Sequence, residues 1–90
     1  MYQIKNYSYQ RAKELGYTIL PSTKKDKKID VYKNNDYLFS IGNLNFGDFP
    51  TFIELYGLEY ALERRRLYHL RHSKDNIKGT KGWWAAMLLW

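Results

Sequence analysis

The chain has 90 residues, which suits one domain over residues 1–90, and its 44% hydrophobic and 18% aromatic content is enough to form a core. It contains no cysteine, which excludes disulfide scaffolds, thiolate zinc sites, iron–sulfur clusters and cysteine nucleophiles. Fifteen lysines and arginines against nine acidic residues give a net charge of +6.

The first predicted element is a short helix over residues 9–15. Ser8 is a suitable N-cap for it, and Gly16 suits the left-handed position that follows a helix. Three residues at helical spacing define the face that we expect to be buried, namely Tyr9, Ala12 and Leu15.

A β-hairpin over residues 28–42 is the next predicted element. Residues 18–20 form a brief extended stretch before it, and residues 22–28 form a polar loop rich in lysine. Apolar and polar residues then alternate on both sides of the turn signal at 34–36, which is the pattern of two half-buried strands.

Helices dominate the second half of the chain. Asp48 and Pro50 mark the start of a helix over 49–56, and a longer helix follows over 58–72. An apolar segment, 83–90, ends the sequence and predicts a short helix. The fold class is therefore α+β, a small single domain in α-β-β-α-α order, with the hairpin covered by helices and by the aromatic C-terminal segment.

Neither a membrane span nor a secretion signal is expected. The longest apolar run, 83–90, is far shorter than the roughly 20 residues that cross a bilayer. Residues 1–6 lack the apolar stretch of a signal peptide.

Positive charge is concentrated in two segments. Residues 64–81 hold seven cations and one anion and therefore carry the whole net charge of +6, while residues 24–28 carry +3. The cations of the first segment are Arg64, Arg65, Arg66, Arg71, Lys74, Lys78 and Lys81. A local basic patch focuses electrostatic potential on a phosphate chain.

Two arginines and two tyrosines share one face of the 58–72 helix, whereas Leu58, Ala61 and Leu62 form its expected core face. Arginine contacts phosphate bidentately, and tyrosine offers a stacking ring and a hydroxyl group. The predicted nucleic-acid-binding residues are Tyr60, Arg64, Tyr68, Arg71, Lys74, Lys78 and Lys81, with Lys24, Lys25, Lys27 and Lys28 as a flanking arm.

A purely structural role for these arginines is the alternative. Arg64 or Arg65 would then stack on aromatic rings or pair with a carboxylate, and Glu63 and Arg66 would form an ordinary surface ion pair. The candidate partners of the two arginines are Trp83, Trp84, Asp48, Glu54 and Asp75.

His69, His72 and Asp75 suggest metal binding or acid–base catalysis, but the surrounding cations repel a divalent ion, and no catalytic motif accompanies them. We therefore expect no catalytic residue, no metal and no cofactor. A small nuclease that uses His72 and Asp75 is the enzymatic alternative.

The apolar C-terminal segment predicts a second surface. Trp84, Leu88 and Trp90 are expected to close the core, and the predicted partner-binding residues are Trp83, Trp84 and Met87. Such a surface would bind either a second copy of the chain, in a homo-oligomer, or another protein.

One pattern spans most of the chain, from about Tyr9 to Trp90. It consists of Ala61-x-x-Arg64-Arg65-Arg66-x-Tyr68-x-x-Arg71-His72-x-x-Asp75, then Gly79-Thr80-x-Gly82-Trp83-Trp84-Ala85 and Leu88-Leu89-Trp90, with Lys27-Lys28-x-x-Val31, Ile41-Gly42 and Phe46-Gly47-Asp48 upstream. It resembles a family of short basic proteins that phages and large DNA viruses encode. The resemblance implies a viral origin and a location in the host cytoplasm or nucleus or in the virion. The family has no established activity, so the resemblance assigns no catalytic residue.

The sequence thus predicts a small basic viral protein, non-enzymatic, that binds the nucleic-acid backbone, with DNA favoured over RNA, and is associated with the virion or the genome. Binding would neutralise phosphates and release counterions. The alternative is a protein-interaction module that meets an acidic protein surface, either as a minor virion or capsid component or as an inhibitor of a host factor.

Overall fold

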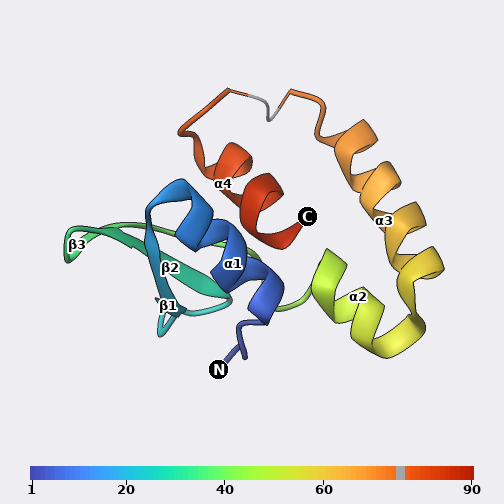
Figure 1. The fold of residues 1–90 in the computed structure, drawn as a ribbon, viewed down its shortest axis with the longest axis horizontal. Coiled ribbons are helices and arrows are strands. Elements are labelled where there is room, and N and C mark those ends of the chain that lie inside the picture. Colours follow the sequence, from blue (N-terminus) through green and yellow to red (C-terminus); the bar gives the residue numbers. More distant parts are fainter. Residues whose placement is uncertain (75–76) are drawn as a thin grey trace.

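A computed structural model describes residues 1–74 and 77–90 of the chain. Its elements follow the order α-β-β-β-α-α-α, and the predicted α+β class is confirmed (Figure 1). The helices are α1 (Asn6–Leu15), α2 (Phe49–Tyr56), α3 (Leu58–Arg71) and α4 (Lys81–Leu89), and the strands are β1 (Thr18–Pro21), β2 (Ile29–Lys33) and β3 (Asp36–Ile41).

The sheet is antiparallel, with the strand order β1-β2-β3. The predicted hairpin is confirmed as β2 and β3, and its turn residues Asn34 and Asn35 both have positive φ. The extended stretch before the lysine-rich segment forms a full third strand, in which Ile19 lies opposite Val31. This third strand matters because an isolated two-stranded hairpin is only marginally stable in water.

Helices α1 and α4 pack against each other and cover one face of the sheet (Figure 1). The strands contribute alternate apolar side chains to this face, and α4 contributes Trp84 and Leu88. Trp90 is also buried, so the prediction that the aromatic segment closes the core is confirmed for these residues. The strand residues of the core are Ile19, Ile29, Val31 and Ile41.

The start of α1 differs from the prediction. The helix begins at Asn6, and Ser8 is not its N-cap but a fully buried residue inside it. The Ser8 hydroxyl donates to the carbonyl of Leu88 at 2.6 Å, and the Arg11 guanidinium donates to the carbonyl of Met87. These two carbonyls lie in the last turn of α4, where intrahelical donors are missing, so α1 satisfies them. The buried face of α1 is consequently centred on Ser8 and Ala12, and Tyr9 is exposed.

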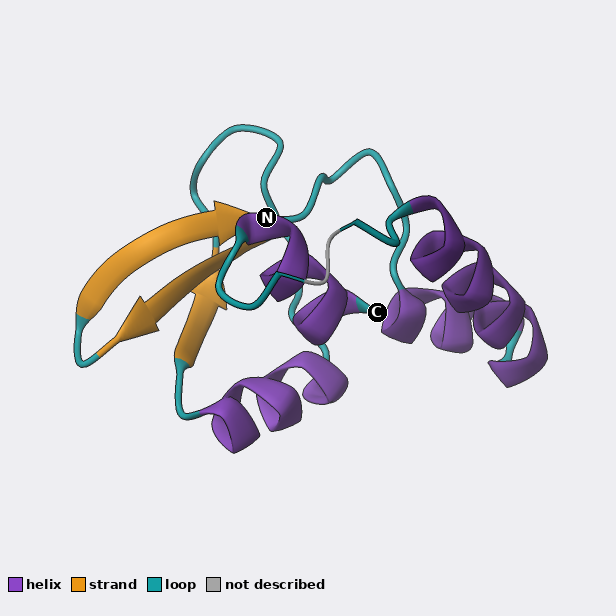
Figure 2. Ribbon diagram, turned by 90° about the horizontal axis from the view of Figure 1, so that it is seen from above, coloured by secondary structure: helices purple, strands orange, loops and turns teal. Residues whose placement is uncertain are grey.

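Helices α2 and α3 form a helical hairpin at the end of the molecule opposite the sheet (Figures 1 and 2). Asp48 caps α2 by accepting a hydrogen bond from the Thr51 backbone N–H, and Pro50 lies in the first turn, as the sequence predicts. Gly57 then separates α2 from α3 with a φ of 92°. The predicted boundary between the two helices is therefore confirmed.

The buried face of α3 was predicted incorrectly at its leucines. Ala61 is fully buried, but Leu58 and Leu62 are 54% and 40% exposed. The reason is that α3 packs through the face that carries its arginines, whose guanidinium groups lie over aromatic rings of α2. In the described part of the chain, no helix is both long enough and apolar enough to cross a bilayer.

Candidate functional site

A cleft of about 490 Å³ opens between α3, α4 and the loop formed by residues 42–47, hereafter the 42–47 loop. Its volume falls within the range of small-molecule sites, roughly 300–1,000 Å³. The residues that line it are Lys28, Gly42, Asn43, Phe46, Gly47, Phe52, Arg64, Tyr68, Arg71, His72, Ala85, Leu89 and Trp90. The cleft thus combines aromatic rings with cationic side chains.

Stacked rings occupy one side of the cleft. The rings of Tyr68 and Trp90 are almost parallel, 9° apart, with centroids separated by 4.4 Å. The ring of His72 also stacks on Tyr68, at 4.3 Å. Tyr68 is only 9% exposed, so it is not the exposed stacking ring that the sequence suggested. Its packing instead holds the C-terminal end of α4 against α3.

Two arginines of α3 lie on phenylalanine rings. The guanidinium carbon of Arg64 is 5.6 Å from the centroid of Phe52, and that of Arg65 is 4.3 Å from the centroid of Phe49. The predicted alternative of aromatic stacking is therefore right in kind but wrong in its partners, because these arginines lie on phenylalanines of α2 and not on Trp83 or Trp84.

The predicted carboxylate partners of these arginines are engaged elsewhere. Asp48 pairs with Lys28 and Glu54 pairs with Lys5, while Asp75 lies outside the described residues. Arg66 pairs with Glu63 at 2.6 Å on the exposed surface, as predicted. Within residues 1–74 and 77–90, the cleft arginines Arg64 and Arg71 form no ion pair.

Arg64 carries a further sign of incomplete pairing. Its Nε atom is buried and makes no hydrogen bond to any described residue. A buried donor that lacks an acceptor is destabilising and uncommon in folded proteins. Arg64 also lines the cleft, and its guanidinium group lies over the ring of Phe52.

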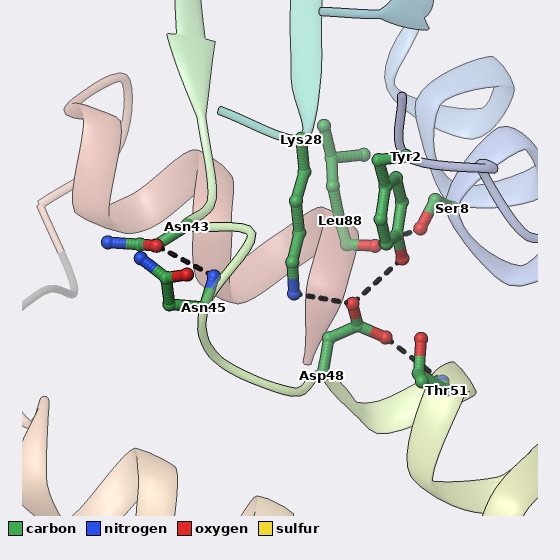
Figure 3. Close-up of polar contacts among 8 residues, drawn as sticks. All are labelled: Tyr2, Ser8, Lys28, Asn43, Asn45, Asp48, Thr51 and Leu88. Carbon is green, nitrogen blue, oxygen red and sulfur yellow. Dashed lines mark hydrogen bonds and ion pairs between the residues drawn. The ribbon is translucent and has the colours of Figure 1, made fainter. Parts of the chain in front are cut away.

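Lys28 behaves differently from the rest of the lysine run (Figure 3). It is 3% exposed, and its Nζ lies 2.7 Å from Oδ2 of the fully buried Asp48. Asp48 also accepts hydrogen bonds from the Tyr2 hydroxyl at 2.8 Å and the Thr51 N–H at 2.9 Å. The sequence assigned Lys28 to the flanking arm of phosphate contacts, but its ammonium group is buried and paired with Asp48, so it is not available for that role.

The charges of this buried cluster shift two pKa values. Burial by itself would raise the pKa of Asp48, but the hydrogen bond and charge of Lys28, with the Thr51 N–H, lower it below its usual value. Burial and the negative charge of Asp48 raise the pKa of Tyr2. Asp48 is therefore held as a carboxylate, and Tyr2 as a neutral donor to it.

The remaining lysines of residues 22–28, hereafter the lysine loop, are exposed: these are Lys24, Lys25 and Lys27. Lys24 donates to the Tyr37 hydroxyl, and this hydrogen bond lowers the pKa of Tyr37. The Leu44 N–H donates to the Asp26 carbonyl at 2.9 Å, which joins the lysine loop to the 42–47 loop. The lysine loop is thus joined to the loop that forms one wall of the cleft.

The other predicted nucleic-acid contacts lie outside the cleft. Tyr60 is 45% exposed and packs on Phe52, with ring centroids 5.6 Å apart. Lys74 and Lys81 are exposed, and Lys78 borders a separate hollow beside Trp83 and Trp84. Of the predicted set, the structure brings Arg64, Tyr68, Arg71 and Lys28 to one cavity.

The predicted partner-binding surface on α4 is corrected at one position. Trp84 is 4% exposed, because its indole packs edge-on against Tyr17 at 4.4 Å, and it is not available to a partner. Trp83 and Met87 are half-buried. Trp83 packs against Trp84, with ring centroids 5.0 Å apart.

Sequence reasoning missed the cleft residues of the 42–47 loop and of α2. Phe46 is 71% exposed at the cleft, and Gly47 packs so closely on Phe52 that an added Cβ would lie 2.2 Å from its ring. The Asn45 N–H donates to Asn43 Oδ1 at 2.9 Å and fixes the turn (Figure 3). The available signal was Phe46 itself, a large apolar residue in a polar, glycine-containing loop.

The histidines give no support to a metal site. In the part of the chain that the structure describes, no three His, Asp or Glu side chains gather to hold an ion. Burial and the nearby charges of Arg65 and Arg11 lower the pKa of His69. The predicted pair of His72 and Asp75 includes a residue outside the described ranges.

Comparison with known proteins adds no relative, because no protein-family model, no curated protein and no solved structure matches the chain. The resemblance to the viral family therefore stays a prediction, and the function is argued from the cleft and its charges.

Proposed function

We propose that this is a non-enzymatic protein that binds the phosphate backbone of nucleic acid, with DNA favoured over RNA. The observation that carries the proposal is the cleft wall of α3, where Arg64 and Arg71 form no ion pair within the described residues. A role associated with a viral genome or virion is part of the same proposal and rests on the resemblance alone.

Phosphate is the ligand group that this wall suits best. A guanidinium group forms bidentate hydrogen bonds with phosphate oxygens, and the contact strengthens where water is partly excluded. Arg64 is half-buried with an unsatisfied Nε, and Arg71 is exposed at the same cleft. An incoming phosphate would supply acceptors and negative charge that residues 1–74 and 77–90 do not provide to these arginines.

A polymer fits the wider surface better than a single small anion. The lysine loop adds three exposed lysines, and it is hydrogen-bonded through Asp26 to Leu44 of the loop that lines the cleft. Several phosphates along a strand could therefore be contacted together, with release of counterions. Affinity of this kind falls steeply as salt concentration rises.

A protein-interaction module is the second candidate, and a different surface favours it. The α2–α3 hairpin exposes large apolar side chains, namely Leu55, Tyr56, Leu58 and Leu62. Exposed apolar groups that lie together favour association with a partner. Analytical ultracentrifugation tests the homo-oligomer form of this candidate, because L58S and L62S would then shift a dimer to monomer.

The proposed function is tested by fluorescence anisotropy with labelled single-stranded and duplex DNA of equal length, between about 50 and 200 mM salt. We expect binding at low salt, and R71Q should reduce the slope of log affinity against log salt by about 1. R66Q is the matched control, because it removes the same charge from a residue that pairs with Glu63 and does not line the cleft. Absence of binding to both DNAs at low salt, or equal effects of the two variants, would contradict the proposal.

A further inference from the structure

We propose that the cleft holds one unpaired nucleotide, with its phosphate on the arginines of α3 and its base on the ring of Phe46. The inference rests on the proposed function and adds the form of nucleic acid that the site selects. It assigns the protein a preference for single strands, strand ends or extruded bases over an intact duplex.

The volume of the cleft suits a single nucleotide better than a duplex. At about 490 Å³ it has the size of a small-molecule site. In a duplex the faces of the bases are covered by their neighbours, so a protein can contact only base edges and the backbone. Only an unpaired base can place its flat face inside such a cavity.

Phe46 supplies the ring on which a base would stack. It is 71% exposed, which is unusual for phenylalanine, and it lines the cleft. The loop that carries it is fixed on both sides, by the Leu44–Asp26 backbone bond and by the close packing of Gly47 on Phe52. An exposed ring on a fixed loop can stack with a base without a large ordering cost.

The polar groups of the cleft are suitably placed for the rest of a nucleotide. Arg64 and Arg71 line the α3 side, which provides two guanidinium groups for the phosphate. Asn43 lies on the same loop as Phe46, and its Oδ1 accepts from the Asn45 N–H. Its side-chain NH₂ makes no hydrogen bond within the described ranges and remains as a donor to a base edge.

Lys28 and Tyr68 line the cleft but are excluded from this role. The ammonium of Lys28 is already neutralised by Asp48, and the ring of Tyr68 is already stacked on Trp90 and His72. Their engagement leaves the two arginines as the anion-binding groups and Phe46 as the exposed stacking ring of the cavity.

The experiment compares an oligothymidine strand with a matched strand of abasic residues, which carries the same number of phosphates without bases. We expect the oligothymidine strand to bind about tenfold more tightly at equal salt, since base stacking on an aromatic ring contributes an effect of this order. F46A should remove that advantage. L44A is the matched control, because Leu44 is an exposed apolar residue of the same loop that does not line the cleft.

The outcomes separate this inference from the proposed function. If both strands bind equally and F46A has no effect, the base-binding role is wrong while phosphate binding stands. If neither strand nor a duplex binds at low salt, the proposed function fails and the inference fails with it. Circular dichroism of F46A should match the wild type, because the Phe46 side chain is largely exposed.

Discussion

The two sides of the cleft, one next to the sheet and one on the α2–α3 hairpin, treat positive charge in opposite ways. On the sheet side, Lys28 is buried against Asp48, which in turn accepts hydrogen bonds from Tyr2 and Thr51. On the α2–α3 side, Arg64 is half-buried on the Phe52 ring, and its Nε has no acceptor among the described residues. Lys28 is fully compensated within the fold, whereas Arg64 has no acidic partner among the described residues.

The difference separates a structural charge from one that is available to a ligand. A buried ion is tolerated when its partners are complete, and it then fixes the segments that it connects. The Lys28–Asp48 pair connects the start of β2 to the start of α2. The cleft arginines lack a carboxylate partner within the described part of the chain, which is the reason for proposing that they bind phosphate.

The largest expected effect is the loss of the buried pair. K28M should lower the free energy of unfolding by about 3–5 kcal/mol, because it leaves the Asp48 carboxylate buried without its cation. Urea denaturation measures the change. R66M, which breaks an exposed pair, should leave the midpoint almost unchanged.

Acid should reduce the difference between K28M and the wild type. In the wild type the pKa of Asp48 is lowered, so its stabilising contribution is present above its ordinary value of 3.8 and is lost as pH falls through the folded-state pKa. In K28M the buried Asp48 carboxylate has no opposing cation, so burial favours its protonated form. Protonation in acid then removes the unpaired charge. A constant difference from pH 7 down to acid would contradict this assignment.

The next effect concerns the 42–47 loop, which joins β3 to α2. G47A should destabilise the protein by about 1–3 kcal/mol, because the added Cβ would lie 2.2 Å from the Phe52 ring. For a domain of this size, a loss of 1 kcal/mol lowers the melting temperature by roughly 4–8 °C. A melting temperature equal to that of the wild type would show that the loop does not pack on Phe52.

A carboxylate added to the cleft should pair with the cleft arginines and make them less available to phosphate. N43D places an acid beside the cleft arginines and should weaken DNA binding about tenfold near 0.1 M salt, as expected for the loss of one phosphate contact. N45D makes the same change in the same loop at an exposed residue that does not line the cleft. Equal weakening by both variants would mean that the cleft is not the binding site.

The smallest expected effect is on the pH dependence of stability. The pKa of His69 is lowered by burial and by Arg65 and Arg11, so folding favours the neutral ring. The contribution is present above the ordinary value of 6.5 and is lost as pH falls through the folded-state pKa. Urea midpoints between pH 7 and 5 should fall less for H69Q than for the wild type.

The local structure was largely predictable from the sequence. Asn34 and Asn35 tolerate the positive φ of a tight turn, and this fixes the hairpin. Asp48 and Gly57 define the ends of α2. These features depend on residues close together in the chain, so their effects can be assessed without the tertiary structure.

The burial of α3 and the cleft itself could not be predicted in this way. Hydrophobic periodicity assigns Leu58 and Leu62 to the core, but aromatic rings of α2 select the arginine face instead. The cleft joins Phe46, Phe52 and Trp90, which tertiary packing brings together. The burial of Lys28 could not be predicted from the lysine run, because Asp48, with which it pairs, lies 20 residues further along the chain.

The binding surface can be mapped most directly by titrating ¹⁵N-labelled protein with the oligothymidine strand and following the backbone amide shifts. We expect the largest shifts in three segments, the 42–47 loop, residues 64–72 and residues 85–90, with small changes in α1 and β1. Shifts centred on α1 and β1, or on the exposed leucines of the α2–α3 hairpin alone, would contradict the assignment of the cleft as the nucleic-acid site.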